Sequence, residues 1–136
     1  MSFGNTYENN ILDGLFGSGQ ITALSTMWIG LSTATLNEDA SSLAEPSGNG
    51  YARVAVVNST NIWSPAAAGV KRNAAAIAFP TATGSWGNCT DFAVWAAATS
   101  TGVGAYIGYG VLGTPKNVTN GDVPTFGVGS LSITLD

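Results

Sequence analysis

The chain has 136 residues, of which 9% are charged, and its formal net charge at pH 7 is −4. This length corresponds to one domain that can bury a core of its own. Roughly 25% of the residues of an ordinary soluble domain are charged, so this surface must be rich in uncharged side chains. Little charge has to be desolvated when a neighbour covers such a surface. The composition therefore indicates a subunit of an assembly, and we expect a homo-oligomer.

The charge pattern argues against a nucleic-acid partner. A phosphate backbone requires clustered Lys and Arg, and Lys71 and Arg72 are the one adjacent pair among four basic residues. We expect no membrane insertion, because no run reaches the roughly 18 apolar residues that span a bilayer. The start of the chain lacks the basic and apolar regions of a signal peptide. These features predict a protein that is made in the cytoplasm.

The first 17 residues have the period of a helix. Large apolar side chains recur there at intervals of three and four: Phe3, Tyr7, Ile11, Leu12, Leu15 and Phe16. Asn5 and Glu8 have the spacing of a capping box, and the glycines at 17 and 19 end the segment. So short a helix gains little stability alone. The six apolar residues are therefore candidate assembly contacts, with packing on the domain's own sheet as the alternative.

After Gly19 the apolar period changes to two, which is typical of strands. Alternating segments occur at residues 27–32, 51–57, 74–79, 90–97, 105–112 and 130–135. In the last of these we expect Leu131, Ile133 and Leu135 to point inward.

Turn residues dominate the segments between these strands. Residues 34–50 and 58–69 are predicted to be long loops. Gly108 and Gly110 lie at alternate positions of one strand, which predicts that a ring or another backbone crosses the sheet there.

This order of elements predicts a mainly β fold: an antiparallel β-sandwich or barrel-like single domain with a short N-terminal helix. The domain is expected to span residues 1–136, with the helix in 1–17 and the β part in 20–136.

Few residues here can perform chemistry. The absence of histidine excludes Ser-His-Asp and Cys-His systems and most zinc sites. Asp91 begins a strand and Asp122 lies in a turn, so neither forms an evident pair of catalytic carboxylates. Residues 108–113 match G-x-G-x-x-G, but no helix follows to bind a pyrophosphate. We expect no enzymatic activity, no cofactor and no metal, and a buried, structural Cys89.

The tryptophans could either fill the core or stack on sugars. Alternation along residues 90–97 places Trp95 on the outward face, and Trp63 lies in a loop next to Pro65. Both are therefore predicted to be exposed, and they are the candidate residues for recognising a host-surface glycan.

Three blocks in a fixed order carry a resemblance to a known family: residues 48–54 (GNGYARV), 79–87 (FPTATGSWG) and 91–95 (DFAVW), flanked by 28–33 and 129–136. The chain resembles small structural proteins of tailed-bacteriophage virions that are commonly labelled tail-fibre or minor tail proteins. The resemblance implies a non-enzymatic component of the particle surface, made in the bacterial host and most simply tail-associated. It would act by subunit assembly and surface display.

The resemblance also implies contacts with other virion proteins, and analogy with phage fibres and decoration proteins points to a trimer. Two alternatives stay open at this point. One is a capsid decoration protein, and the other is a carbohydrate-binding module for receptor recognition.

Overall fold

The structure is a computed structural model and describes residues 1–135. Within that range the elements are β1 (Ser2–Phe3), α1 (Asn5–Phe16), β2 (Thr26–Ser32), β3 (Val54–Val57), β4 (Val70–Arg72), β5 (Ile77–Ala78), β6 (Gly87–Trp95), the 3-10 turn η1 (Val103–Ala105), β7 (Tyr106–Val118), β8 (Thr125–Phe126) and β9 (Ser132–Thr134). The prediction of a mainly β fold with antiparallel sheets and a short N-terminal helix is confirmed.

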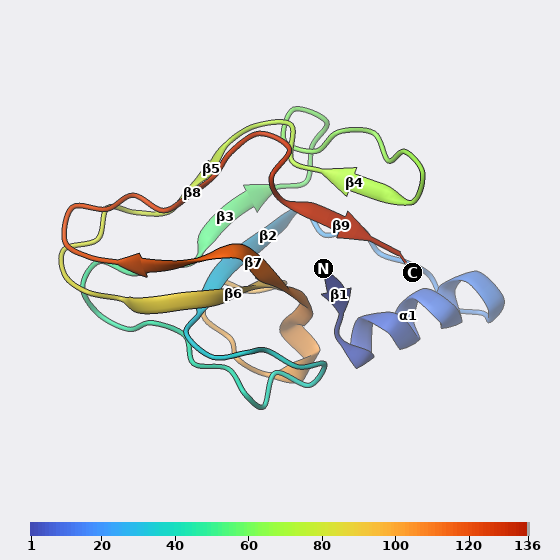
Figure 1. The fold of residues 1–136 in the computed structure, drawn as a ribbon. Coiled ribbons are helices and arrows are strands. Elements are labelled where there is room, and N and C mark those ends of the chain that lie inside the picture. The colour runs from blue at the N-terminus through green and yellow to red at the C-terminus, as the bar shows by residue number, and fades with distance from the viewer. Residues whose placement is uncertain (136) are drawn as a thin grey trace.

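A five-stranded antiparallel sheet in the order β1-β7-β6-β2-β3 forms the centre of the molecule (Figure 1). Two short ribbons, β4 with β9 and β5 with β8, lie over one side of this sheet as a second layer (Figure 1). The ribbons pair segments far apart in the chain, Val70–Arg72 with Ser132–Thr134 and Ile77–Ala78 with Thr125–Phe126. The second layer is thus closed by the C-terminal part of the chain.

Apolar side chains are buried on both faces of the central sheet. Phe92 and Val94 of β6 belong to the larger core cluster, which the ribbons cover. The alternate residues Ala93 and Trp95 belong to a second cluster, and Leu36 from the loop after β2 packs with them. Because successive side chains of a strand point to opposite faces, the loop after β2 must cover the second face. Burial on both faces explains why β6 ends in an unbroken apolar run, residues 92–95.

The glycines of β7 lie where the prediction placed a close approach. A Cβ atom on Gly110 would lie 2.7 Å from the ring of Phe92, and one on Gly108 would collide with the carbonyl oxygen of Ser2. β1 runs along β7 at this point, with Ser2 opposite Tyr109 and Phe3 opposite Gly108. The prediction that a ring or another backbone crosses here is confirmed.

Several predicted boundaries differ from the structure. The strand predicted at residues 74–79 is reduced to Ile77–Ala78, and β7 continues to Val118 because it pairs with the start of β6. Leu131 is buried as predicted, but Leu135 is exposed. It lies beyond Thr134, the last paired residue of β9.

Helix α1 does not begin with the predicted capping box. Gly4 is the N-cap residue, and no side chain caps the helix. The N–H of Gly4 donates to the carbonyl of Ile107 at 2.9 Å, and its own carbonyl accepts from Tyr7 and Glu8. The helix start is therefore fixed by its attachment to the sheet, which local sequence spacing does not reveal.

Candidate functional site

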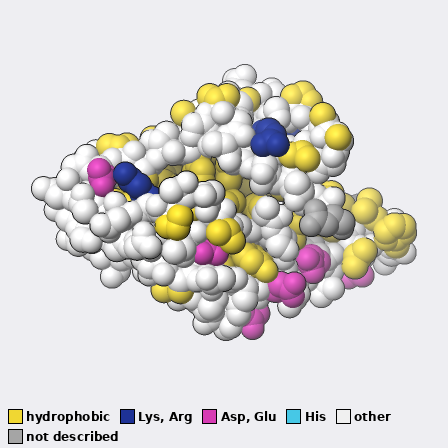
Figure 2. Space-filling model, in the orientation of Figure 1, with side chains coloured by type: hydrophobic (Ala, Val, Ile, Leu, Met, Phe, Trp, Pro, Cys, Tyr) yellow, Lys and Arg dark blue, Asp and Glu magenta, His cyan; other side chains and the backbone are white. Residues whose placement is uncertain are grey.

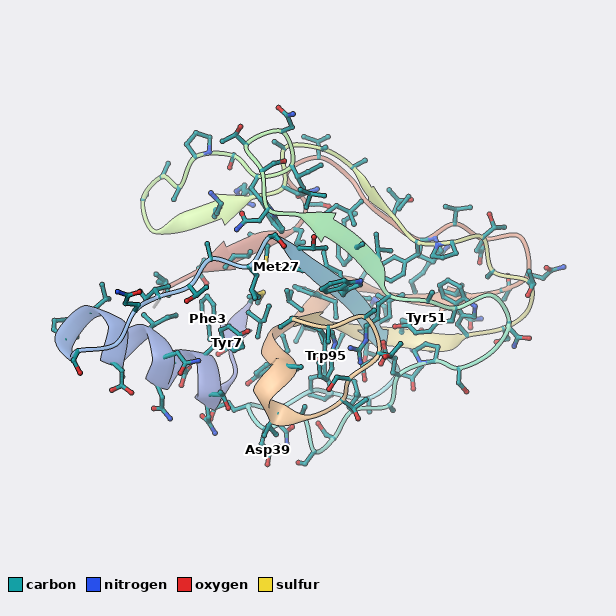
Figure 3. The ribbon with its side chains drawn as sticks, turned by 180° about the vertical axis from the view of Figure 1, so that it is seen from behind. Phe3, Tyr7, Met27, Asp39, Tyr51 and Trp95 are labelled. Atoms are coloured by element: carbon teal, nitrogen blue, oxygen red, sulfur yellow. The ribbon has the colours of Figure 1, made fainter. Side chains whose placement is uncertain are left out.

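Helix α1 is attached to the sheet at one end only. Phe3 and Tyr7 pack against the larger core cluster, near Met27 (Figure 3). Further along, four large apolar side chains are more than half exposed: Leu12, Leu15, Phe16 and Ile21. We call these four residues the helix tip. They form the apolar projection at the right of Figure 2, and Phe16 is 85% exposed.

The helix tip has a defined shape. The N–H groups of Gly17 and Gly19 both donate to the carbonyl of Asp13, at 3.0 and 3.2 Å, which turns the chain back along the helix. The side chain of Ile21 then lies against Gly14, where a Cβ atom would collide with it. The tip is thus a folded-back helix end rather than a loose terminus.

The helix surface is acidic beside these apolar groups. Glu8 lies in the first turn, Asp13 is exposed further along, and the last turn carries no basic residue. A groove of about 300 Å³ separates the helix from the end of β9 and is lined by Glu8, Ile11, Leu12 and Leu135 among others.

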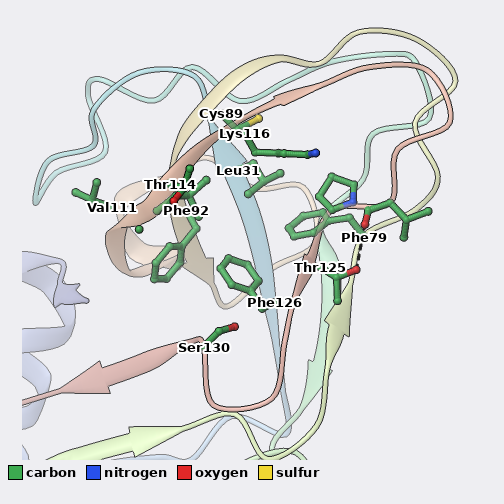
Figure 4. Close-up of a pocket in the computed structure, with 14 residues that line it drawn as sticks. Leu31, Phe79, Cys89, Phe92, Val111, Thr114, Lys116, Thr125, Phe126 and Ser130 are labelled. Atoms are coloured by element: carbon green, nitrogen blue, oxygen red, sulfur yellow. Dashed lines mark hydrogen bonds between the residues drawn. The ribbon is translucent and has the colours of Figure 1, made fainter.

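A larger hollow lies between β7 and β8, and we call it the crevice (Figure 4). Its volume is about 560 Å³. The rings of Phe79, Phe92 and Phe126 line it, and the exposed side chains of Val111 (70%) and Val123 (49%) stand at its rim. Among its described lining residues Lys116 alone is charged. Neither the crevice nor Ile21 was predicted from the sequence, because the segments that form them meet only in the folded chain.

A buried ion pair holds the loop that covers the second face of the sheet. The guanidinium of Arg53 binds both carboxylate oxygens of Glu45, at 2.8 and 2.7 Å, and donates to the carbonyls of Ala97 and Ser100. It also lies 3.9 Å over the ring of Trp95, and its side chain is 3% exposed. This arrangement joins three distant segments of the chain.

Tyr51, labelled in Figure 3, is also part of this network. Its hydroxyl donates to Glu45 at 2.6 Å and accepts from the N–H of Leu31 at 2.9 Å. Burial, followed by the bond to Glu45, raises the pKa of Tyr51 far above its ordinary value. Gly30 provides the room, because a Cβ atom there would lie 2.6 Å from the Glu45 carboxylate. Residues 51 and 53 of the block GNGYARV are therefore structural.

The turn at residues 48–50 links two of the sequence blocks. Gly48, Asn49 and Gly50 have positive φ angles of 70°, 50° and 76°. In this conformation the carbonyl of Asn49 accepts from Trp86 Nε1 at 2.8 Å and from the N–H of Thr83 at 2.9 Å. The blocks at 48–54 and 79–87 thus occur together because each holds the other in place.

The prediction that Trp63 and Trp95 are exposed is wrong. Trp63 is 2% exposed and Trp95 is fully buried. Trp63 lies opposite Asn73 in an isolated bridge and belongs to the larger core cluster, and Trp95 faces the covered second side of the sheet. Neither ring offers a face on which a sugar could stack.

The two carboxylates singled out in the sequence, Asp91 and Asp122, have structural partners. Buried Asp91 accepts from the N–H of Leu36 at 3.2 Å, and Asp122 accepts from the N–H of Thr119 at 2.8 Å. Within residues 1–135 no group of three or more His, Cys, Asp or Glu is placed to hold a metal ion. Cys89 is buried, and burial raises its pKa. No helix of the described chain is long and apolar enough to cross a membrane.

Comparison with known families extends these observations. The family described as Podophage GP4 fiber I protein gp80 matches residues 2–134. The chain belongs to this family. Its resemblance to structural proteins of tailed phages is therefore confirmed, and its family is one of phage fibre structural proteins. A comparison of the chain with curated proteins found no match.

Proposed function

We propose that this protein is a non-enzymatic, tail-associated fibre subunit that acts by assembly and surface display, with the helix tip as its assembly contact. The observation that carries the proposal is the exposure of four large apolar side chains on a folded, defined element. Contiguous apolar surface on a soluble protein usually marks an interface. Membership in a fibre family supplies the setting in which such an interface is needed.

The energetics favour a covered tip. Burying a Leu, Ile or Phe side chain contributes roughly 1.5–3 kcal/mol before ordering costs. The start of the helix already has this stabilisation from Tyr7 and from Phe3 of the preceding β1, so the exposed half gains it only from a neighbour. Of the six candidate assembly contacts, Leu12, Leu15 and Phe16 are thus the ones free to act between subunits.

The double substitution Leu12→Asp and Leu15→Asp tests this role. Both side chains are exposed in the subunit, so we expect normal folding, with a free energy of unfolding within about 1 kcal/mol of wild type. We expect loss of self-association and of incorporation into particles. Sedimentation velocity and quantitative mass analysis of purified particles measure these two properties.

A matched control variant introduces the same two negative charges outside the helix tip. Val57 and Val103 are exposed to a similar degree outside the helix tip, so Val57→Asp with Val103→Asp should assemble normally. Normal incorporation of the L12D/L15D variant would contradict the proposal. The copy number of the protein in the particle distinguishes a tail component from a protein that decorates the whole capsid. Sedimentation equilibrium of the isolated protein tests whether it is a trimer.

A further inference from the structure

We propose that the helix tip of one copy of this chain seats in the crevice of the next copy, forming a head-to-tail contact. The inference rests on the proposed function in that it takes the helix tip to be an assembly surface. It adds the partner and the place where the tip binds.

The two surfaces match in chemical character. The tip is a convex group of Leu and Phe side chains, whereas the crevice is a concave site lined by three phenylalanine rings. Phe16 is the most exposed large side chain of the tip. Its ring can pack edge-to-face with Phe126, the partly exposed ring of the crevice, which already forms such a pair with buried Phe92 at a centroid distance of 5.4 Å. One contact between them would remove apolar surface of both the crevice and the helix tip from water.

Charge complementarity favours the crevice over a second helix tip. Glu8 and Asp13 accompany the tip, and Lys116 is the charged residue among the described lining of the crevice. Asp122 lies near enough to Lys116 for the lysine to help lower its pKa, but its carboxylate is bonded to Thr119 and does not line the crevice. A two-fold contact between tips would instead bring Asp13 near its own copy. Like charges at an interface disfavour that pairing.

The placement of the two surfaces fits a repeating contact. The helix tip extends at the right of the molecule in Figure 1, whereas the crevice lies between β7 and β8 on the left. A contact between two different surfaces of identical subunits is heterologous, and it propagates into a ring or a filament. Such growth suits a fibre.

Mixing two complementary variants tests the contact. Leu15→Asp with Phe16→Asp disables the tip, and Val123→Asp places an acidic group at the exposed rim of the crevice without touching its buried rings. We expect each variant alone to sediment as a monomer. Their equimolar mixture should form a 1:1 dimer and nothing larger, because only one intact tip and one intact crevice remain per pair. The matched control Val123→Lys should assemble like wild type.

Other outcomes would overturn the inference. A two-fold contact between tips predicts that V123D assembles normally while the L15D/F16D variant stays monomeric. Docking on a different virion protein predicts a wild-type chain that is monomeric at every concentration. In that last case the proposed function still stands if incorporation into particles depends on the tip, so the two failures are distinguishable.

Cysteine cross-linking gives an independent readout. Cys89 is a free, buried thiol that lines the crevice, so the cysteine variants are made in a Cys89→Ala background. We expect Phe16→Cys and Val123→Cys chains, mixed under mild oxidation, to yield a disulfide-linked heterodimer. Cross-linking only between two F16C chains, or none at wild-type assembling concentrations, would contradict the inference. Asp13→Lys and Lys116→Glu should each weaken assembly a few-fold, and their combination should restore it.

Discussion

At the scale of single residues, Arg53 is the most consequential side chain of this fold. It is the basic residue that pairs with Glu45, and the same guanidinium serves two loop carbonyls and the face of Trp95. Lysine cannot reproduce this, because it lacks the planar fork that binds a carboxylate through two parallel hydrogen bonds. In a chain with only 9% charged residues, a buried ion pair has a specific structural role.

Replacing Arg53 by Ala is expected to destabilise the domain strongly. It leaves the Glu45 carboxylate without its cation and two carbonyls without their donor. Breaking a buried pair from one side costs about 3–5 kcal/mol, and the partial exposure of Glu45 places this case near the lower value. Urea unfolding monitored by tryptophan fluorescence measures the change. Arg72→Ala is the control, since exposed Arg72 makes one bond to Gly129 and should change stability by about 0.5 kcal/mol or less. A similar effect of both substitutions would contradict this account of the ion pair.

At the scale of elements, the sequence predicted the features that depend on local patterns and missed those that depend on contacts between distant segments. β2 and β6 were found from alternation, because each carries its own apolar pattern. The burial of Trp95 was not predicted, because alternation distinguishes the two faces of a strand but does not show that both faces are covered. Leu36 and Glu45 provide that cover together with Arg53, and both come from the segment 34–50 that was predicted to be a long loop.

The assembly surface shows the same limit. The apolar stripe of α1 was visible from its period, but its division into an anchored half and an exposed half depends on where β1 pairs with β7. The crevice is built from residues 31, 79, 89, 92, 111–114, 116, 123–126 and 130, which come together only through the ribbon of β5 and β8. No local pattern marks such a hollow.

Strand β7 offers a matched pair of glycines for a test. Gly110→Ala places a methyl group 2.7 Å from the ring of Phe92, whereas a Cβ atom on Gly113 meets nothing within 4 Å. We expect G110A to destabilise the domain by about 1–3 kcal/mol through overpacking. We expect G113A to change it by less than about 0.5 kcal/mol. Midpoints of urea unfolding compare the two, and equal midpoints would show that Gly110 is not required for the close approach of Phe92.

At the scale of the whole molecule, low charge and apolar projections act together. The net charge of −4 is spread over acids near α1, in the loop at residues 38–39 and at Asp122, while the exposed bases lie on β4 and β7. Self-repulsion between copies is therefore weak, and a contact needs little desolvation of charge. The surface is suited to close association that is driven by apolar burial and oriented by a few charges.

The response of assembly to salt separates these two contributions. Sodium chloride at 1 M shortens the Debye length to about 3 Å and screens the acidic tip from Lys116, while leaving apolar burial in place. A sulfate salt at the same ionic strength screens charges to the same degree. It also strengthens apolar burial, because sulfate is excluded from the protein surface. We expect a loss of a few-fold in association constant in chloride and a gain in sulfate relative to chloride, measured by sedimentation equilibrium. If chloride abolished association, or if sulfate gave no gain over chloride, the contact would be mainly ionic and the helix tip would not be its principal element.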